Sequence, residues 1–390
     1  MNGMFADRKW VIRNLGFDPV ATPAPQAAYA VAAAAHPRAE VEDLQREIID
    51  FDSEAPAGRE FMAFTTATGM TRFEDIPWPS GMAPKTDPQP KGNGSKPLPK
   101  ADVLVVTWTV DEGHALSRVL TPGKDSRDDY LPYTHNYAAI SKKMRAGCPA
   151  RNARRLGSFW NTSIAGKSVV VFKCDSHLSQ DTEKTAPPPG TLPNYDVWRQ
   201  IIQEVQPKLV ITTGTGGGIG KECEVGDVVV SSIVRYDAIK WLKSTPYHNA
   251  VYTDGKPNAK YFATAKKLFK ANADRLPQDN TRPPKIFVAK TNPTSVVTTD
   301  FFGFDISDNH YGLQGLGMIC EMGDAVLGQV ASDTSSPPRW VAVRNVSDPQ
   351  IKAEGTLRDQ SRLAANIYKG FGRWSSVCSA IVCWALIAAE

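Results

Sequence analysis

A glycine-rich segment, Thr212 to Gly220 (TTGTGGGIG), is the first candidate for ligand chemistry. A backbone without side chains can come close to a ligand, which is why such segments often bind phosphates or sugars. A dinucleotide fingerprint, G-x-G-x-x-G, does not fit, because its last glycine would fall on Ile219. A Walker A loop, G-x-x-x-x-G-K-[ST], fails at two required positions. Both motifs need a helix next, whereas DVVVSS from residue 227 indicates a strand. The segment therefore predicts a turn between two strands, either plain or close to a ligand.

Asp348 is the first candidate for acid or base chemistry. It follows a predicted buried strand, Trp340 to Val343 (WVAV), and loops at this place in α/β sheets often carry catalytic groups. It also precedes Pro349, so an Asx turn or a helix N-cap is the plain alternative. The position alone leaves both interpretations open.

The elements that would position these residues alternate along the chain. Short apolar, β-branched runs predict strands, at 102–108, 167–173, 209–213, 227–234, 285–289, 317–320 and 340–343. Apolar residues at helical spacing predict helices, at 195–205, 264–273, 324–332 and 357–387, the last broken near Gly370 and Gly372. This alternation is typical of a layered α/β domain.

Composition limits the class of protein. Hydrophobic residues make up 42% of the chain, enough to bury a large core. The net charge is +4, from 45 basic and 41 acidic residues, a balance that does not indicate nucleic-acid binding. The six cysteines are far apart, without a C-x-x-C or a zinc-type spacing, so we expect buried free thiols and no metal site.

The chain is predicted to contain three parts. Residues 1–77 form a region of unknown role that we expect to be partly helical, from the apolar spacing within Val41 to Ile49. Residues 78–100 are rich in Pro and Gly and are interpreted as an irregular linker. Residues 101–390 form the α/β domain. No signal-peptide pattern is found at the N-terminus, and the apolar stretch 377–389 is too short to span a bilayer, so we expect a cytoplasmic protein without a membrane segment.

Three segments, in order, resemble the nucleoside phosphorylase/nucleosidase superfamily. Residues 211–237 (ITTGTGGGIG…VGDVVVSSIVRYD) are similar to its strand, its T-G-[ST]-x-G-G turn and its V-G-D-[IV]-V-V-S strand. Residues 319–331 (ICEMGDAVLGQVA) are similar to its E-M-E-x-x-A segment, and residues 340–351 (WVAVRNVSDPQI) to its strand ending in R-x-[IV]-S-D. The resemblance covers residues 101–387. It implies a three-layer α/β/α fold around a mixed, twisted sheet, a homodimer or larger oligomer, and no cofactor or metal.

The resemblance also implies a reaction, cleavage of the N-glycosidic bond of a purine nucleoside or nucleotide. Asp348 matches the aspartate that protonates the purine, which requires a raised pKa. Glu112 matches the glutamate that activates water, with Asp111 one residue away as an alternative. The other residues match positions that bind the substrate: Thr215, Gly216, Phe302, Glu321, Met322 and Arg344. Arg344 has a second interpretation, a partner for a buried carboxylate.

One position departs from the family pattern. The second glutamate of E-M-E, which binds the ribose hydroxyls in the family, falls on Gly323. Either Asp324 or Glu321 replaces this contact, or the substrate differs at its hydroxyls, or activity has been lost. A non-catalytic nucleotide sensor is therefore a competing hypothesis.

The nucleophile is predicted to be water rather than phosphate. Thr212 occupies the position where phosphorylases of the superfamily usually have a phosphate-binding arginine, and the loop after the first strand lacks their G-[DN]-P-x-R segment. A phosphorylase is the alternative. The basic insertion 142–155 (KKMRAGCPARNARR) is interpreted as a solvated face. If it lined the pocket, it would favour a nucleotide substrate.

Overall fold

The computed structural model describes residues 76–88, 94–178, 192–238, 242, 247–277, 280–300 and 303–390. The region 1–75, with its predicted helices, lies outside the described residues, and so does Phe302.

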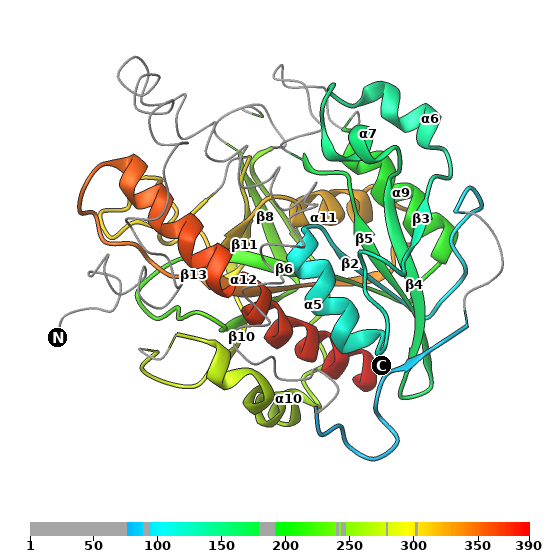
Figure 1. Ribbon diagram of the computed structural model, residues 1–390. Helices are drawn as coiled ribbons and strands as arrows, with labels where there is room; N and C mark the ends of the chain where they lie inside the picture. The colour runs from blue at the N-terminus through cyan, green and yellow to red at the C-terminus, as the bar shows by residue number, and fades with distance from the viewer. Residues whose placement is uncertain are drawn as a thin grey trace, which may run out of the picture.

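The centre of the structure is a mixed sheet of thirteen strands (Figure 1). Its main path runs β1-β4-β5-β2-β6-β12-β11-β8-β9. Off this path, β13 pairs with β6, β7 pairs with β13 and with β10, and β3 pairs with β4. The strands are β1 (Lys85–Thr86), β2 (Val103–Thr107), β3 (Leu131–Tyr133), β4 (Gly157–Ile164), β5 (Lys167–Cys174), β6 (Leu209–Gly218), β7 (Val228–Ser231), β8 (Ile233–Asp237), β9 (His248–Thr253), β10 (Ile286–Val288), β11 (Val296–Thr298), β12 (Ile319–Glu321) and β13 (Arg339–Asp348). The predicted strand 227–234 is thus two strands that part at Ser232.

Strand β6 organises the sheet. Its first half is parallel to β2, nearly its whole length is parallel to β13, and its end pairs antiparallel with β12. The predicted glycine turn is wrong, because the glycines continue this strand as far as Gly218. They are needed for close packing: a Cβ at Gly216 would stand 2.7 Å from the carbonyl oxygen of Cys320, and one at Gly217 2.6 Å from that of Gly303.

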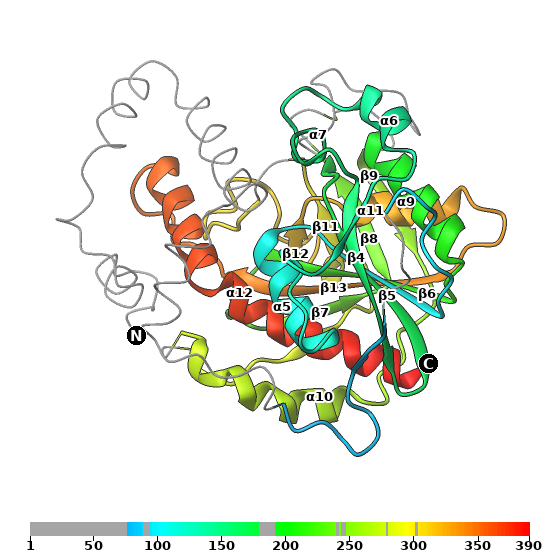
Figure 2. The ribbon, with the colours of Figure 1, turned by 45° about the vertical axis from the view of Figure 1, so that its right-hand side comes forward.

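Helices cover both faces of the sheet, which confirms the predicted three-layer α/β/α architecture (Figures 1 and 2). One face carries α5 (Val110–Leu120), α10 (Phe262–Leu268) and α12 (Leu357–Ala389), and the other carries α9 (Pro193–Val205) and α11 (Asp324–Ser332). Alternate residues of β2 serve the two cores: Val103 and Val105 face the α12 side, and Leu104 and Val106 the α9 side. Shorter helical segments are α6 (Tyr137–Ile140), α7 (Pro149–Ala153) and the 3-10 turns Ser141–Lys143, Phe269–Arg275 and Asn292–Thr294.

Helix α12 is unbroken, so the predicted break near Gly370 and Gly372 is wrong. A glycine costs a helix about 1 kcal/mol relative to alanine, which burial of a long apolar face outweighs. Gly372 instead allows close packing, since a Cβ there would be 3.3 Å from the Tyr368 ring. By length and composition α12 is the one helix among the described residues that could cross a membrane, but 89% of its most apolar window is buried inside the protein.

The predicted linker packs against the domain where it is described. The two residues of β1 pair with β4, so the segment is not wholly irregular. Trp78 lies 4.8 Å from the Trp384 ring, whose indole N–H donates to the carbonyl of Met82. Leu98 is buried, and its N–H donates to Glu204.

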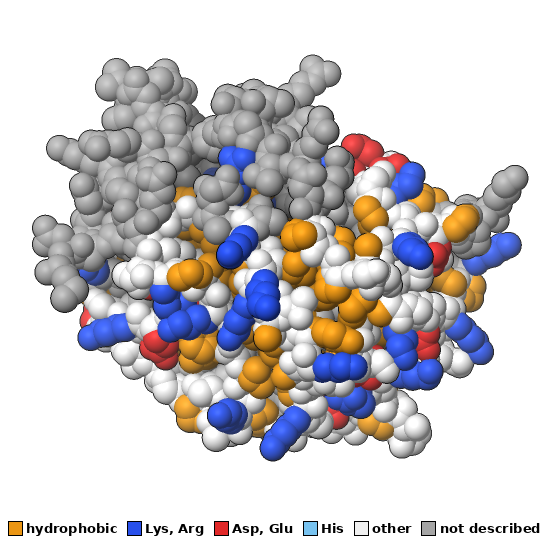
Figure 3. Space-filling view, turned by 90° about the horizontal axis from the view of Figure 1, so that it is seen from below, with side chains coloured by type: hydrophobic (Ala, Val, Ile, Leu, Met, Phe, Trp, Pro, Cys, Tyr) orange, Lys and Arg blue, Asp and Glu red, His pale blue; other side chains and the backbone are white. Residues whose placement is uncertain are grey.

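Figure 3, seen from below, shows the face that carries α10, where basic side chains are spread among apolar ones.

All six cysteines are free and buried, as predicted from their spacing. Burial raises the pKa of the Cys378 and Cys383 thiols, both on α12, to about 12. These thiols therefore act as small apolar groups in the core.

Replacing Ile381 by alanine tests the role of α12 as a core helix. Its side chain is fully buried against the sheet. Ile381→Ala should lower the free energy of unfolding by about 2–5 kcal/mol, because it removes apolar contacts and leaves a cavity. Val251→Ala is the control at an exposed site and should cost less than about 0.5 kcal/mol. Urea denaturation measures both, and equal losses would contradict the packing described.

Candidate active site

A pocket opens where β2, β6 and β13 run side by side toward their carboxyl ends. It encloses about 650 Å³ of space, its open mouth included, which suits a small organic ligand. Its lining comes from six strand ends or loops and from two helices. The lining residues are Trp108, Thr109, Glu112, His177, Thr215, Gly216, Gly217, Gly303, Cys320, Glu321, Met322, Arg344, Ser347, Asp348 and Tyr368.

Glu112 is fixed at the first turn of α5 by a capping box with Thr109. Its Oε2 accepts hydrogen bonds from the Thr107 hydroxyl (3.1 Å) and from the N–H groups of Trp108 (3.2 Å) and Thr109 (2.9 Å). Its Oε1 accepts from both the N–H and the hydroxyl of Thr215, each at 2.7 Å. Burial alone would raise the pKa of Glu112, but the charge of Arg344 and these donors lower it overall. Glu112 is therefore an ionised carboxylate at neutral pH.

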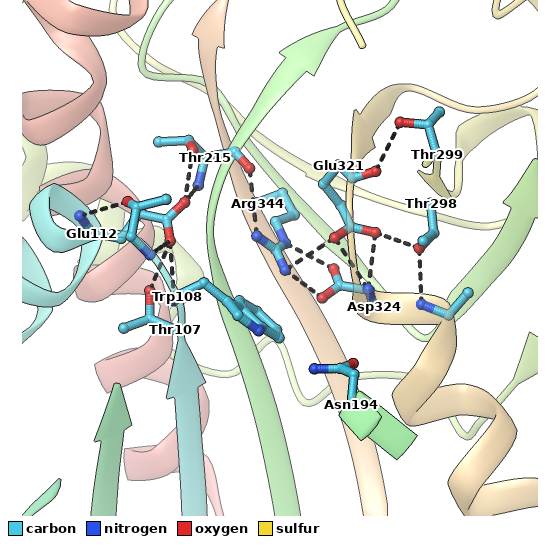
Figure 4. A network of polar contacts seen from close by, with 12 residues as sticks. Thr107, Trp108, Glu112, Asn194, Thr215, Thr298, Thr299, Glu321, Asp324 and Arg344 are labelled. Carbon is cyan, nitrogen blue, oxygen red and sulfur yellow. Dashed lines mark hydrogen bonds and ion pairs between the residues drawn. The ribbon is translucent and has the colours of Figure 1, made fainter. Parts of the chain in front are cut away.

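Arg344 is the buried cation of the pocket and is 3% exposed (Figure 4). Its Nε donates to Oδ2 of Asp324 at 2.8 Å, and its Nη2 donates to the other oxygen, Oδ1. The guanidinium also lies 4.8 Å from the Trp108 ring centroid and 3.3 Å from Oε2 of Glu321. Burial alone would lower the pKa of Arg344, but the two carboxylates raise it. The sequence left open whether Arg344 pairs with a carboxylate or reaches the substrate, and it both pairs and lines the pocket.

Gly214 allows Glu112 and Arg344 to come together. A Cβ at this position would stand 2.5 Å from Oε1 of Glu112 and 2.8 Å from Nη1 of Arg344. The next residue, Thr215, joins them through its backbone, because its N–H donates to Glu112 and its carbonyl accepts from Arg344 at 3.5 Å. Only glycine leaves room for this contact between β6 and its neighbours.

Asp348 is the last residue of β13 and is 1% exposed. The Ser347 hydroxyl donates to its Oδ1 at 2.8 Å, whereas its Oδ2 has no hydrogen-bond partner among the described residues. Burial raises the pKa of Asp348 to about 7, against the opposing hydrogen bond from Ser347. The pocket thus pairs a carboxyl group that holds a proton near neutral pH with an ionised carboxylate, Glu112.

Glu321 and Asp324 lie differently with respect to the pocket. Glu321 lines the pocket, and burial together with the neighbouring charge of Asp324 raises its pKa to about 8, against the effect of Arg344. Asp324 does not line the described pocket, and both of its oxygens are bound to Arg344. The idea that Asp324 replaces the missing ribose contact is therefore not supported, and Glu321 is the better placed of the two.

The remaining predicted residues fall as follows. Thr215, Gly216 and Met322 line the pocket, whereas Phe302 lies outside the described residues. Asp111, the alternative to Glu112, does not line it and instead pairs with Arg127 at 3.2 Å. The structure brings Glu112, Arg344 and Asp348 into one pocket.

Several lining residues were not predicted, and three of them, Trp108, His177 and Tyr368, have ring side chains. Trp108 stands at the end of β2, where a large aromatic residue after a buried strand was a usable signal. His177 lies in a loop after β5, and burial and the charge of Lys173 lower its pKa to about 4, so its ring is neutral. Tyr368 comes from α12, far along the chain, and donates to the Thr109 hydroxyl at 3.4 Å. Nothing in the local sequence indicated His177 or Tyr368.

The basic insertion is bound to the body of the domain where it is described. Arg155 donates to Asp175 at 2.6 Å, and Lys143 to Asp196 at 2.5 Å. No residue of 142–155 lines the described pocket. No group of three or more His, Cys, Asp and Glu among the described residues is arranged to hold a metal ion.

Fold and site together define an α/β protein with a pocket at the ends of its strands. The pocket contains one carboxyl group that holds a proton near neutral pH, Asp348, and one that is ionised, Glu112. Comparison with known families narrows this class. The model of the Phosphorylase superfamily matches residues 132–383. The chain therefore belongs to the phosphorylase superfamily.

Individual relatives are more distant. A 5′-methylthioadenosine/S-adenosylhomocysteine nucleosidase of Chromohalobacter salexigens is 51% identical over 37 residues, which are 10% of this chain and 16% of that protein. The chain thus spans about a sixth of the length of this curated relative. The corresponding nucleosidase of Neisseria meningitidis, solved with methylthio-immucillin-A, is similar with a TM-score of 0.45 and 15% identity over 74% of this chain and 100% of its own. Futalosine hydrolase of Helicobacter pylori gives 0.44 and 13% identity over 73% and 96%.

Replacing Gly214 by alanine tests the close contact of Glu112 and Arg344 with the backbone of β6. The new methyl group would overlap both side chains, so Gly214→Ala should lower the free energy of unfolding by about 1–3 kcal/mol. Gly255→Ala is the matched control, because a Cβ there meets nothing within 4 Å. Chemical denaturation compares the two variants, and equal stabilities would show that the contact is not as described.

The raised pKa of Asp348 predicts a pH-dependent stability. Because its pKa rises from 3.8 to about 7 on folding, the folded protein binds more protons than the unfolded chain between these values. The contribution of Asp348 to stability should therefore fall as the pH rises from about 4 to 7. Asp348→Asn lacks this loss, so its melting temperature relative to wild type should increase with pH. The exposed Asp128→Asn is the control. If the melting temperatures of wild type and Asp348→Asn changed with pH in the same way, the raised pKa of Asp348 would be contradicted.

Proposed function

We propose that this chain hydrolyses the N-glycosidic bond of a purine nucleoside or nucleotide, with water as nucleophile. The free base and the ribose or ribose phosphate are the products. The observation that carries the proposal is the pair of carboxyl groups in one pocket, Asp348 with a pKa of about 7 and Glu112 ionised.

Each group has one step. Oδ2 of Asp348 gives its proton to a ring nitrogen of the base, so that the base leaves as a neutral molecule while the C–N bond breaks. Glu112 accepts a proton from the water that attacks the sugar carbon from the opposite face, and a C–O bond forms. Five hydrogen bonds already reach Glu112, so the water must displace one of its donors. In this proposal the water replaces the hydroxyl of Thr215, a residue that lines the pocket. Arg344 stabilises the ionised form of Glu112.

Water is favoured over phosphate by the charge of the pocket. Among the described lining residues Arg344 is the one permanent cation, and Asp324 already binds it. His177 has a pKa of about 4 and is neutral. Thr212, where phosphorylases have an arginine, is fully buried and does not line the described pocket. An incoming phosphate dianion would therefore find little positive charge. The same reasoning favours a nucleoside over a nucleotide, since no residue of the basic insertion lines the described pocket, and its Lys143 and Arg155 pair with Asp196 and Asp175. We include in the proposal a cytoplasmic homodimer or larger oligomer.

Product analysis tests the reaction. The purified protein is incubated with adenosine, methylthioadenosine, inosine, AMP and ATP, each with and without phosphate, and free base is measured by chromatography. We expect base without phosphate, and a loss of about 10²- to 10⁴-fold in kcat for Glu112→Gln and for Asp348→Asn, since each removes one proton transfer. Asp128→Asn, exposed and outside the pocket, is the control. Base release only with phosphate would indicate a phosphorylase, and binding without any base release would indicate a sensor.

A further inference from the structure

Asp324 is a buried carboxylate that the proposed reaction does not use. It is the first residue of α11 and is 1% exposed. Its two oxygens bind two nitrogens of Arg344, so the pair is bidentate (Figure 4). This geometry fixes the plane of a guanidinium and not only its position. Asp324 therefore determines where Arg344 points.

A second carboxylate competes for the same cation. Oε2 of Glu321 lies 3.3 Å from Nη2 of Arg344, the nitrogen that also donates to Asp324. The N–H of Asp324 donates to both oxygens of Glu321, at 3.0 and 3.1 Å, which ties the two residues together. On its other side Arg344 reaches the Thr215 carbonyl, next to Glu112. One guanidinium thus lies between the carboxyl groups of Glu321 and Asp324 on one side and the Thr215 carbonyl, next to Glu112, on the other.

We propose that Asp324 is a positioning residue, which holds Arg344 against the Thr215 side of the pocket and keeps Glu321 from drawing it away from Glu112. The proposal rests on the proposed function, in which Glu112 accepts the proton of the attacking water. Asp324 itself touches neither that water nor the substrate, since it lies behind Arg344 and does not line the described pocket.

The charges support this arrangement. Burial and, next, the charge of Asp324 raise the pKa of Glu321 to about 8, so it holds a proton at neutral pH and is a weak competitor for Arg344. Without the charge of Asp324, Glu321 would ionise more easily and pair with Arg344 itself. The charge of Arg344 would then act less on Glu112, whose pKa would rise. Other titratable or charged groups around the two glutamates are Asp111 and His177 near Glu112, and Tyr236 and Cys320 near Glu321.

Kinetics of Asp324→Asn test the proposal. We expect kcat at pH 7 to fall about 10- to 100-fold with KM changed less than threefold, as for a misplaced catalytic group. The acid limb of kcat/KM should move to higher pH, because Glu112 must be ionised to act as a base and its pKa has risen. The double variant Asp324→Asn/Glu321→Gln removes the competing charge, so its acid limb should move back toward wild type. Asp333→Asn, at the other end of α11 and exposed, should match wild type.

Several outcomes would overturn the proposal. A raised KM with unchanged kcat would make Asp324 a substrate contact. An unchanged acid limb in Asp324→Asn, or one that Glu321→Gln does not restore, would make its role structural. If Asp324→Asn does not fold, Asp324→Glu keeps the charge but moves the carboxylate by one methylene, and wild-type kinetics from it would contradict a precise positioning role.

A measurement without turnover separates this proposal from the proposed function. Because folding raises the pKa of Glu321 from 4.5 to about 8, the contribution of Glu321 to stability should fall as the pH rises through this range. Asp324→Asn should fall less steeply, since it removes one cause of the shift. Wild-type protein that releases no base but shows this difference would refute the proposed function alone. Base release together with equal slopes for Asp324→Asn and wild type would refute the role of Asp324 alone.

Discussion

The pocket depends on one buried guanidinium. Arg344 extends from the central part of the sheet, and carboxylates from α5, β12 and α11 are arranged around it. A buried charge without a partner would cost several kcal/mol, so each of these buried groups needs the others. The bidentate pair with Asp324 and the face of Trp108 compensate for the lost hydration of Arg344. The charge that remains acts on Glu112.

The backbone of β6 makes this arrangement possible. Three strands and two carboxylates meet along its second half, where glycines leave space for the carbonyl of Cys320, the carboxylate of Glu112 and the oxygen of Asp348. The same residues continue the strand, so the peptide groups stay hydrogen-bonded to β13 and β12. A true loop would have to satisfy those peptide groups in another way. The second half of β6 must therefore let neighbouring groups come close and also stay paired with β13 and β12. A glycine-rich strand does both.

Much of the fold could be predicted from the sequence, because hydrophobic period and element length are local properties. The strand at Val103–Thr107 and the helix at Asp324–Ser332 have such patterns and were predicted closely. The continuous β6 could not be predicted, since glycine indicates a turn unless the neighbouring strands are known. The unbroken α12 could not be predicted either, because glycine indicates a break unless the burial of the helix against the sheet is known.

Site residues could be predicted from the sequence where they occupy a family motif. The role of a residue that acts by positioning another side chain could not. Glu112, Arg344 and Asp348 occupy motif positions and lie in one pocket. Asp324 stands in a motif too, but its role depends on which way its carboxylate points, and a sequence does not contain that direction. The protonation states show the same limit. Asp348 is buried with one hydrogen bond and holds its proton near neutral pH, whereas the equally buried Glu112 receives five hydrogen bonds and a nearby positive charge. Two carboxyl groups become acid and base because their surroundings differ, and those surroundings come from segments more than 100 residues apart.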